Sequence, residues 1–374
     1  MIQVGLITYH SAYNFGSVLQ AYATQEIIKS LGYNVEIINY RMPSQRNYYS
    51  LFPHGLGIGR TRQSILALLD YNKRKKRQKK YERCINDLFK MTDEMTEPSE
   101  LYSLANKYDV YISGSDQIWN RYSNELRYVD WRKYMSPYLL EFTEKKKISY
   151  ASSINGMRDD DLEKISSALQ RFDYISMREN TACQRLDKLL GIKSVTVIDP
   201  TLLLNSDIWN EMIKDWVNPY TLGRYVIYYS LDGSNRRLIK DIAHIKKIVE
   251  SNTEIIVICP FETPLFCRGI INASDACIYD FMGLIRDAEY VISSSYHGVM
   301  FSLIFEKQFC FLQRNIEMDS RVEDLKMRIG VDIQIVSSIE EIQMKDEIDC
   351  SLIKERLEEL RVVSMQYIQK AIRC

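Results

Sequence analysis

The residues best suited to chemistry follow short apolar runs, at the points where strands are expected to end. His297 stands in the segment SSSYHG, between a run of serines and a glycine, and is one of four histidines in the chain. An imidazole has an intrinsic pKa of about 6.5, so it can give and take a proton near neutral pH. Asp116 in SGSDQIWN and Arg178 in SMREN occupy similar positions. These three side chains bring charge and proton-transfer capacity to the strand ends.

A structural role is the alternative for each of these residues. Asp116 could cap a helix that begins at QIWN, and Arg178 could pair with Glu179. Asp199 in VIDPTLLL could likewise cap the turn that follows it. A lone histidine is more often a satisfied core residue than a catalytic one, but the serines and glycine beside His297 favour a functional role.

Strands alternating with helices must position these residues. Residues 2–8 form an apolar, β-branched run, 17–31 repeat Leu, Ala and Ile at helical spacing before Gly32, and NVEIINY supplies a second strand. Further runs of strand length lie at 108–115, 146–154, 174–177, 195–199, 224–231, 254–259, 290–294 and 308–312. Helical patterns separate most of them, which is typical of α/β proteins with doubly wound parallel sheets.

The length of 374 residues favours two domains. Asn, Pro and Gly loosen the segment NSDIWNEMIKDWVNPYTLG before a new strand begins. We expect an N-terminal Rossmann-like domain over 1–205 with a basic helical insertion at about 60–90, and a C-terminal domain over 206–350 that carries SSYHG. A C-terminal helix over 351–374 is expected to cross back to the N-terminal domain.

Composition excludes several classes of protein. Lys+Arg and Asp+Glu both total 49, so no overall charge favours nucleic acid or a membrane. The eight cysteines form no CxxC pair and no metal-like spacing, which indicates a reduced protein without structural zinc. The sequence shows no basic leader and no apolar run of about 18 residues. We expect a cytoplasmic protein that uses no metal ion or cofactor and binds no nucleic acid.

Two further segments are candidates for anion binding. Asn14 and Gly16 precede the first helix, where free N–H groups favour a phosphate, although a tight turn capped by Asn or Ser is the alternative. The run NKRKKRQKK follows apolar residues within 65–69 and predicts peripheral contact with anionic lipid head groups or a lipid-linked pyrophosphate. A solvated helical face is the alternative. The basic residues of the run are Lys73, Arg74, Lys75, Lys76, Arg77, Lys79 and Lys80.

Several blocks taken together resemble the polysaccharide pyruvyl transferase family. They are HSAYNFGSVLQAYA, YDVYISGSDQIWN, YASSI, ISMREN, VIDPTLLL and DAEYVISSSYHGVMFSLIFEKQF, in the family's order and spacing. The resemblance spans about residues 1–330 and implies a GT-B-like fold, with two Rossmann-like domains facing a cleft. It also implies transfer of the enolpyruvyl unit of phosphoenolpyruvate, a co-substrate, onto a sugar as a pyruvate ketal.

The resemblance implies roles for particular residues. His297 matches the family's catalytic histidine, and Asp116 matches the acidic position of the GSDxxW block. Arg178 and the loop at Asn14 and Gly16 suit the phosphate and carboxylate of the donor. The other residues expected to bind the donor are Ser294, Ser295, Gly298, Arg314 and Arg321. The residues expected to bind the acceptor are Ser115, Gln117, Trp119, Ser152 and Ser153.

One position departs from the family pattern. Many members carry an arginine two residues before the histidine, where this chain has Ser295. Arg314 or Arg321, shortly after the next strand, could supply the missing cation. The alternative is that the phosphate is held differently.

Three functions stay open at this level. The first is a ketal-forming pyruvyl transferase, cytoplasmic or peripheral on the inner face of the plasma membrane. Its acceptor would be a lipid-linked (undecaprenyl-type) or nucleotide-linked sugar of a bacterial capsule or exopolysaccharide. The second is a GT-B-like glycosyltransferase that uses a nucleotide sugar, for which the C-terminal domain offers only Asp280 and Asp287 as acidic candidates. The third is a non-catalytic carbohydrate-assembly protein with the same fold.

Overall fold

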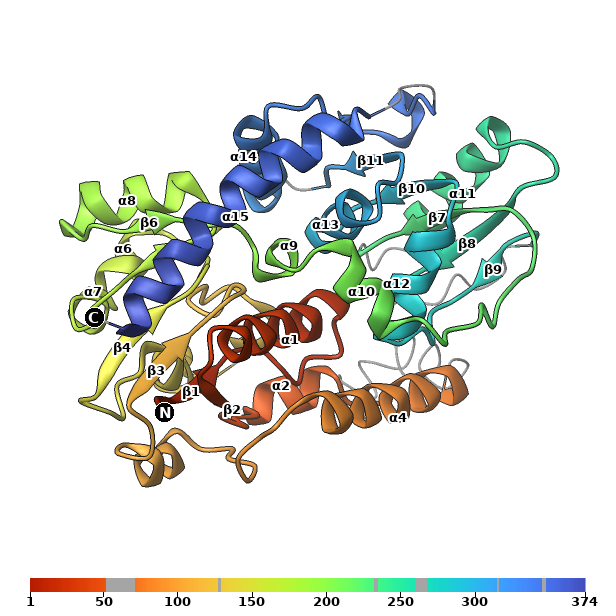
Figure 1. Cartoon of the computed structure of the whole chain (residues 1–374). Coiled ribbons are helices and arrows are strands. Elements are labelled where there is room, and N and C mark those ends of the chain that lie inside the picture. Colours follow the sequence, from red (N-terminus) through yellow and green to blue (C-terminus); the bar gives the residue numbers. More distant parts are fainter. Residues whose placement is uncertain are drawn as a thin grey trace. The chain divides into compact units, whose positions relative to one another are not determined.

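The computed structural model describes residues 1–51, 71–126, 129–231, 235–259, 268–314, 316–344 and 348–373. The chain divides into two compact units, each a parallel sheet with helices (Figure 1). The first unit comprises Met1–Leu68, Glu82–Leu203 and Glu358–Cys374, and the second comprises Leu69–Tyr81 and Leu204–Leu357. The predicted α/β class with two Rossmann-like domains is confirmed.

A four-stranded sheet forms the centre of the first unit. Its order is β2-β1-β3-β4, and all neighbours run parallel. The central strand β3 is buried along its whole length, as expected for a parallel strand covered on both faces. The strands are β1 (Gln3–Ile7), β2 (Asn34–Ile37), β3 (Val110–Ser113) and β4 (Lys146–Ser149), with a separate parallel pair, β5 (Ser176–Met177) and β6 (Val195–Thr196).

Helices and short 3-10 turns connect these strands. α1 (Phe15–Ser30) ends just before Gly32, whose φ of 83° lies in the left-handed region that glycine adopts without strain. The other elements of this unit are α2 (Pro43–Tyr48), η2 (Pro98–Leu104), η3 (Asn124–Leu126), α5 (Trp131–Met135), η4 (Ser136–Leu139), α6 (Asp159–Glu163), α7 (Ser166–Leu169), α8 (Asn180–Leu190) and α9 (Pro200–Leu203).

The second unit has a six-stranded parallel sheet of order β12-β11-β10-β7-β8-β9. Its strands are β7 (Tyr225–Tyr229), β8 (Glu254–Ile258), β9 (Ile271–Asn272), β10 (Tyr290–Ser293), β11 (Phe309–Leu312) and β12 (Ile335–Val336). Its helices are α10 (Ser206–Met212), α11 (Asn235–Ile248), α12 (Ile278–Asp287), α13 (Tyr296–Ile304), α14 (Ile316–Ile329) and η5 (Ile339–Glu341).

The last helix, α15 (Cys350–Arg373), starts in the second unit and ends in the first. The Tyr367 hydroxyl donates to the Ser149 carbonyl at 2.9 Å, and the Ser364 hydroxyl accepts from the Ile198 amide at 3.0 Å. The predicted return of the C-terminal helix is therefore confirmed. In the described part of the chain, no helix combines the length and the apolar character needed to cross a bilayer.

The basic run lies in the first part of α4 (Tyr71–Leu88), and this part of the helix belongs to the second unit. Lys76 Nζ lies 2.7 Å from the Asp275 carboxylate, and Lys80 Nζ lies 2.7 Å from the Asp280 carboxylate. Both carboxylates are buried, so lysines that approach them stabilise this packing. We expected the whole insertion in the N-terminal domain; the structure instead joins Leu69–Tyr81 to the second unit through these ion pairs.

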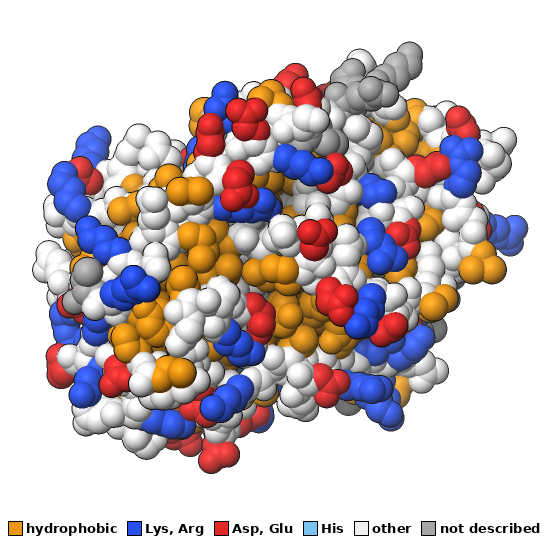
Figure 2. Space-filling view, viewed as in Figure 1, with side chains coloured by type: hydrophobic (Ala, Val, Ile, Leu, Met, Phe, Trp, Pro, Cys, Tyr) orange, Lys and Arg blue, Asp and Glu red, His pale blue; other side chains and the backbone are white. Residues whose placement is uncertain are grey.

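The remaining features of the basic run bear on membrane contact. Lys73 Nζ donates to the Asn272 carbonyl at 3.1 Å, whereas Lys75 and Lys79 are exposed. The apolar residues within 65–69, which precede the run and were considered with it for membrane contact, lie outside the described residues. On the face shown in Figure 2, basic and acidic side chains are interspersed.

The Lys80–Asp280 pair should contribute measurably to stability. Burial raises the pKa of Asp280, but the hydrogen bonds from Lys80 and the Cys277 amide overcome this effect and lower it overall. We predict that Lys80→Met lowers the unfolding free energy by about 1–3 kcal/mol, because a buried carboxylate then loses its cation. Lys79→Met, at an exposed neighbour, should change it by less than about 0.5 kcal/mol in the same urea titration. Equal effects would contradict this account.

Candidate functional sites of the two units

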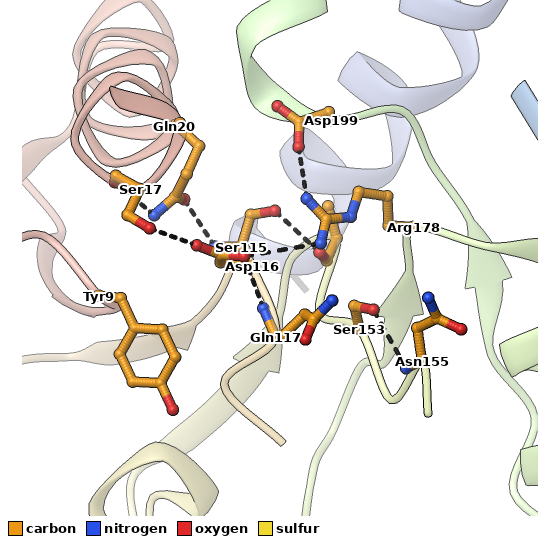
Figure 3. A network of polar contacts seen from close by, with 12 residues as sticks. Tyr9, Ser17, Gln20, Ser115, Asp116, Gln117, Ser153, Asn155, Arg178 and Asp199 are labelled. Carbon is orange, nitrogen blue, oxygen red and sulfur yellow. Dashed lines mark hydrogen bonds and ion pairs between the residues drawn. The ribbon is translucent and has the colours of Figure 1, made fainter. Parts of the chain in front are cut away.

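Polar residues that follow β1 and β3 meet at the carboxyl edge of the first sheet (Figure 3). Thr8 Oγ1 donates to the Ser115 carbonyl at 3.1 Å and accepts from Gln20 Nε2 at 2.7 Å. The Ser115 amide donates to Gln20 Oε1 at 3.1 Å. Gln20 of α1 thus ties the helix to both strand ends, and the loop that carries Asp116 is fixed from two sides.

Asp116 is held by several groups and keeps some exposure. Its carboxylate accepts from Ser17 Oγ at 2.7 Å and from the Gln117 amide at 2.8 Å, and its side chain is 13% exposed. Its φ is +78°, a left-handed conformation that costs energy for a residue with a Cβ and is enriched at functional sites. The helix that Asp116 would cap in the structural alternative is absent, since residues 117–120 form a turn. The Trp119 indole N–H, which donates to the Tyr138 carbonyl at 3.0 Å, helps to hold that turn.

Arg178 lies beside Asp116 and is almost fully buried (Figure 3). Its guanidinium donates to Asp199 at 2.8 Å and lies 3.6 Å from Glu179 and 3.7 Å from Asp116. Asp199 also accepts from the amide and hydroxyl of Thr201, which matches its alternative role as a cap. One cation therefore serves three carboxylates. The negative surroundings favour a neutral hydroxyl ligand over a phosphate, so the donor role of Arg178 stays a prediction and its contacts indicate a positioning role.

Most of the expected acceptor-binding residues build the scaffold of this site. Ser115 and Ser152 are buried, and their hydroxyls donate to the carbonyls of Ala151 and Ser113. Ser153 and Trp119 are also buried; the Ser153 hydroxyl donates to Glu179, and the Trp119 ring packs edge-to-face on Phe172. Of the five, only Gln117 is partly exposed.

The loop before α1 is a capped turn. Asn14 is the N-cap residue, and its side-chain oxygen accepts from the Gly16 amide at 3.0 Å. The Ser17 hydroxyl from the first turn points to Asp116 instead. This arrangement matches the capping alternative, and a donor role for Asn14 and Gly16 stays a prediction.

In the second unit, the serine run forms the turn between β10 and α13. The Ser293 hydroxyl accepts from the Ser295 amide at 3.0 Å, and the Ser294 hydroxyl accepts from the Leu231 amide at 2.9 Å. A Cβ on Gly298 would lie 2.0 Å from Ser293 Oγ, so only glycine lets the helix approach the strand this closely. Ser294 and Gly298, both expected at the donor, therefore also fix the position of His297.

His297 is the second residue of α13 and is 7% exposed. Its ring stands edge-on to Tyr296, with centroids 5.4 Å apart, and the Arg321 guanidinium lies 5.1 Å from the Tyr296 ring. Arg314 instead contacts Asp241 and donates to the Tyr228 hydroxyl at 3.3 Å. Of the two arginines considered for the missing cation, Arg321 lies beside the histidine motif and Arg314 is engaged by a buried carboxylate.

Sequence reasoning missed a third arginine near this turn. Burial raises the pKa of Tyr229 to about 12, while a Ser295 hydrogen bond and the Arg77 charge act in the opposite direction. Tyr229 also lies against Gly298, with its ring 3.1 Å from the position of a Cβ there. Arg77 thus belongs to the surroundings of the SSSYHG turn. Nothing in the spacing of the basic run signals this placement.

The first unit also contains a buried acid and a buried base that the motifs do not reveal. Burial, followed by the charge of Asp116, raises the pKa of Glu125 from 4.5 to about 7. Burial lowers the pKa of His10 from 6.5 to about 4; its ring lies 3.0 Å from Asn39 Oδ1 and 3.2 Å from the Thr8 carbonyl. Both shifts disfavour the charged form.

These two shifts act on stability with opposite signs. Between pH 4.5 and 6.5, His10 is protonated only in the unfolded chain, so its contribution to stability rises with pH. Glu125 is protonated only in the folded chain over the same window, so its contribution to stability falls as pH rises. For each group, the unfolding free energy changes by about 1.4 kcal/mol per pH unit. We predict that the unfolding free energy of Glu125→Gln, relative to wild type, rises by about 2–3 kcal/mol over this window in urea titrations. A pH-independent difference would show that Glu125 is ionised at pH 5.

Comparisons with known proteins identify a family and a fold. A family model described as polysaccharide pyruvyl transferase matches residues 14–315. A search of curated protein sequences finds no match. Among residues that the structure describes, no group of three or more His, Cys, Asp or Glu could hold a metal ion.

Solved structures show the same fold at low identity. UDP-GlcNAc 2-epimerase from Neisseria meningitidis has a TM-score of 0.52 at 8% identity and covers 100% of this chain and 94% of its own. UDP-N-acetylglucosamine 2-epimerase from Rickettsia bellii has a TM-score of 0.51 at 9% identity, and the match covers 99% of this chain and 98% of the epimerase. UDP-GlcNAc 2-epimerase from Methanocaldococcus jannaschii has a TM-score of 0.50 at 13% identity, and the match covers 96% of this chain and 98% of the epimerase. At these identities the likeness shows the fold, which is of the Rossmann-like GT-B type.

Proposed function

Because the chain belongs to the polysaccharide pyruvyl transferase family, we propose that it converts phosphoenolpyruvate and a sugar into a pyruvate ketal and phosphate. The observation that carries the proposal is the placement of His297 at the start of α13, in a turn that only Gly298 permits. A buried motif of this kind is built to present one side chain in a fixed position. Proton transfer is the chemistry that an imidazole supplies there.

Ketal formation defines the proton transfers that the site must perform. C2 of the donor forms bonds to two sugar oxygens and loses its bond to the phosphate oxygen. Two hydroxyl protons are released; one balances the proton that turns the methylene carbon into a methyl group, and the other balances the protonation of phosphate. We assign proton delivery to the methylene carbon to His297, and orientation or deprotonation of an acceptor hydroxyl to Asp116.

The charges of the two units support different ligands. In the second unit, Arg321 and Arg77 lie near the SSSYHG turn, and guanidinium groups suit the phosphate and carboxylate of the donor. In the first unit, Asp116 and Arg178 belong to a cluster with an excess of carboxylates. We therefore assign donor recognition to the second unit and acceptor recognition to the first.

The rival activity, glycosyl transfer from a nucleotide sugar, has weaker support. Asp280, a candidate for ribose binding, accepts from Lys80 at 2.7 Å and from the Trp216 indole at 3.1 Å. Asp287, the other candidate, pairs with its neighbour Arg286. Both carboxylates are thus engaged within the unit.

Product analysis separates the two activities. The protein is incubated with a panel of lipid-linked and synthetic glycosides and with either phosphoenolpyruvate or UDP-sugars. Phosphate release together with a gain of one pyruvate less one water supports pyruvyl transfer. Release of UDP with a glycosylated product would replace it by the rival, and binding of glycosides with no turnover of either donor would indicate a carbohydrate-assembly protein.

We further propose that the acceptor is a lipid-linked or nucleotide-linked sugar of a surface polysaccharide precursor. Peripheral contact with anionic lipid is proposed for the exposed Lys75 and Lys79 of α4, since three other lysines of the run contact the second unit. We also propose that no metal ion is required, because arginines can balance the charge of the donor. Activity that survives chelation supports this, and activity restored by Mg²⁺ contradicts it.

A further inference from the structure

Glu125 is a buried carboxyl group next to the candidate acceptor cluster of the first unit. It lies in η3 and is 8% exposed. The Tyr49 hydroxyl donates to its Oε1 at 2.9 Å, and the Ser44 hydroxyl donates to its carbonyl at 2.5 Å. No lysine or arginine of the described residues forms an ion pair with it. Burial raises the pKa of this carboxyl group above its usual range, although the hydrogen bond from Tyr49 acts in the opposite direction.

Tyrosines and one other carboxylate surround this group. The Tyr9 hydroxyl lies 3.3 Å from Ser123 Oγ, and its ring stacks edge-on against Tyr138 with centroids 5.0 Å apart. The titratable groups that face Glu125 are Tyr9, Tyr49, Tyr138 and Asp116. Burial raises the pKa of Tyr9, followed by the charges of Glu125 and, more weakly, Asp116.

Backbone contacts place Glu125 and Asp116 around one region. Tyr9 follows Thr8, whose hydroxyl donates to the carbonyl of Ser115, the neighbour of Asp116. Tyr9 in turn contacts Ser123, two residues before Glu125. Figure 3 shows Tyr9 with Ser17 and Asp116 in this part of the site. The loop after β1 therefore links the two carboxyl groups.

The surroundings of the two carboxyl groups differ. The Asp116 carboxylate accepts from a hydroxyl and an amide and lies 3.7 Å from the Arg178 guanidinium. Burial and the charge of Asp116 raise the pKa of Glu125 to about 7, whereas the hydrogen bonds from Tyr49 and Ser123 act in the opposite direction. Near pH 7 a carboxylate fraction of Glu125 is therefore available, and this carboxylate takes up a proton more readily than an exposed one. Paired carboxyls in contrasting environments can divide acid and base work between them.

We propose that Glu125 is a second proton-transfer residue of the acceptor site, beside Asp116. This inference rests on the proposed function. As one acceptor oxygen forms its bond to C2 of the donor, its O–H bond breaks and the proton passes to the Glu125 carboxylate. The proton then passes to water, and the departing phosphate takes a proton from water, so the overall balance of ketal formation is kept.

Glu125→Gln tests this role with little change of shape, because the amide oxygen can still accept from Tyr49. We expect kcat to fall by about 100-fold or more, with the KM of both substrates changed less than about threefold. The limb with an apparent pKa near 7 should vanish from the pH profile of kcat/KM. Glu97→Gln is the matched control, because Glu97 also accepts from a tyrosine hydroxyl, Tyr134 at 2.9 Å, but is 41% exposed. It should keep wild-type turnover.

Two outcomes separate failure of this inference from failure of the proposed function. If the wild-type protein forms no ketal, the proposed function and the role of Glu125 are both overturned. An active wild type whose Glu125→Gln variant keeps more than about a tenth of kcat, or loses activity with the pH limb unchanged, overturns the role of Glu125 alone. Carbon-13 NMR of glutamate-labelled protein supplies a readout that does not depend on activity. The carboxyl signal absent from Glu125→Gln should titrate near pH 7, and titration near pH 4.5 overturns the inference.

Discussion

His297→Gln should lower kcat by about 10²–10⁴-fold, because glutamine fills a similar space but cannot carry a proton at the reacting carbon. Folding should be little affected, since the turn is fixed by Ser293, Ser294 and Gly298 rather than by the imidazole. Phosphate release from phosphoenolpyruvate in the presence of an acceptor is the measurement. Far-ultraviolet circular dichroism establishes that the variant folds.

A second histidine of the same unit provides the control. His244 lies on α11, away from any strand-end motif, and is half-buried. His244→Gln should keep wild-type turnover. If His297→Gln retains more than about a tenth of wild-type kcat, the imidazole is not the proton donor.

Arg178→Met should lower the unfolding free energy by about 3–5 kcal/mol, since it removes the cation from a buried cluster. Asp199, Glu179 and Asp116 would then face one another without a positive charge, and the first two are almost fully buried. Urea denaturation gives the value. Arg171→Met is the control, because Arg171 pairs on the surface with the exposed Glu144 and should cost less than about 1 kcal/mol.

The milder variant Arg178→Lys separates the two roles considered for Arg178. A residue that binds the donor should raise the KM for phosphoenolpyruvate while stability is unchanged. A residue that positions Asp116 should lower kcat and stability together, because one ammonium cannot serve three carboxylates. The contacts of the guanidinium predict the second pattern.

Local patterns predicted the elements of the fold well. Apolar runs gave the parallel strands, and the polar residues that follow them do gather at the carboxyl edge of the first sheet, because strands of one direction end at one edge. The return of α15 was also predicted. The alternative in which Asp116 caps a helix at QIWN was wrong, because tertiary contacts such as the hydrogen bond from Trp119 to the Tyr138 carbonyl hold a turn there.

The charged contacts of the sites could not be predicted from the sequence. Lys80 and Asp280 are 200 residues apart in the chain, and no local rule pairs them. Arg77 looked like part of a solvated or lipid-facing run, and Glu125 belongs to no motif. Burial decides the roles of all of them, and burial depends on packing between distant segments.

The most direct test of pyruvyl transfer is the fate of the donor's carbon and of one solvent proton. Phosphoenolpyruvate labelled with carbon-13 at C2 is reacted with an acceptor glycoside in D₂O, and the product is analysed by NMR and mass spectrometry. Addition with protonation at C3 predicts a quaternary ketal carbon bonded to two sugar oxygens and a methyl group that carries one deuterium. A product that keeps its vinyl protons as an enolpyruvyl ether, or a label left in unreacted donor while a nucleotide sugar is consumed, would contradict the proposed function.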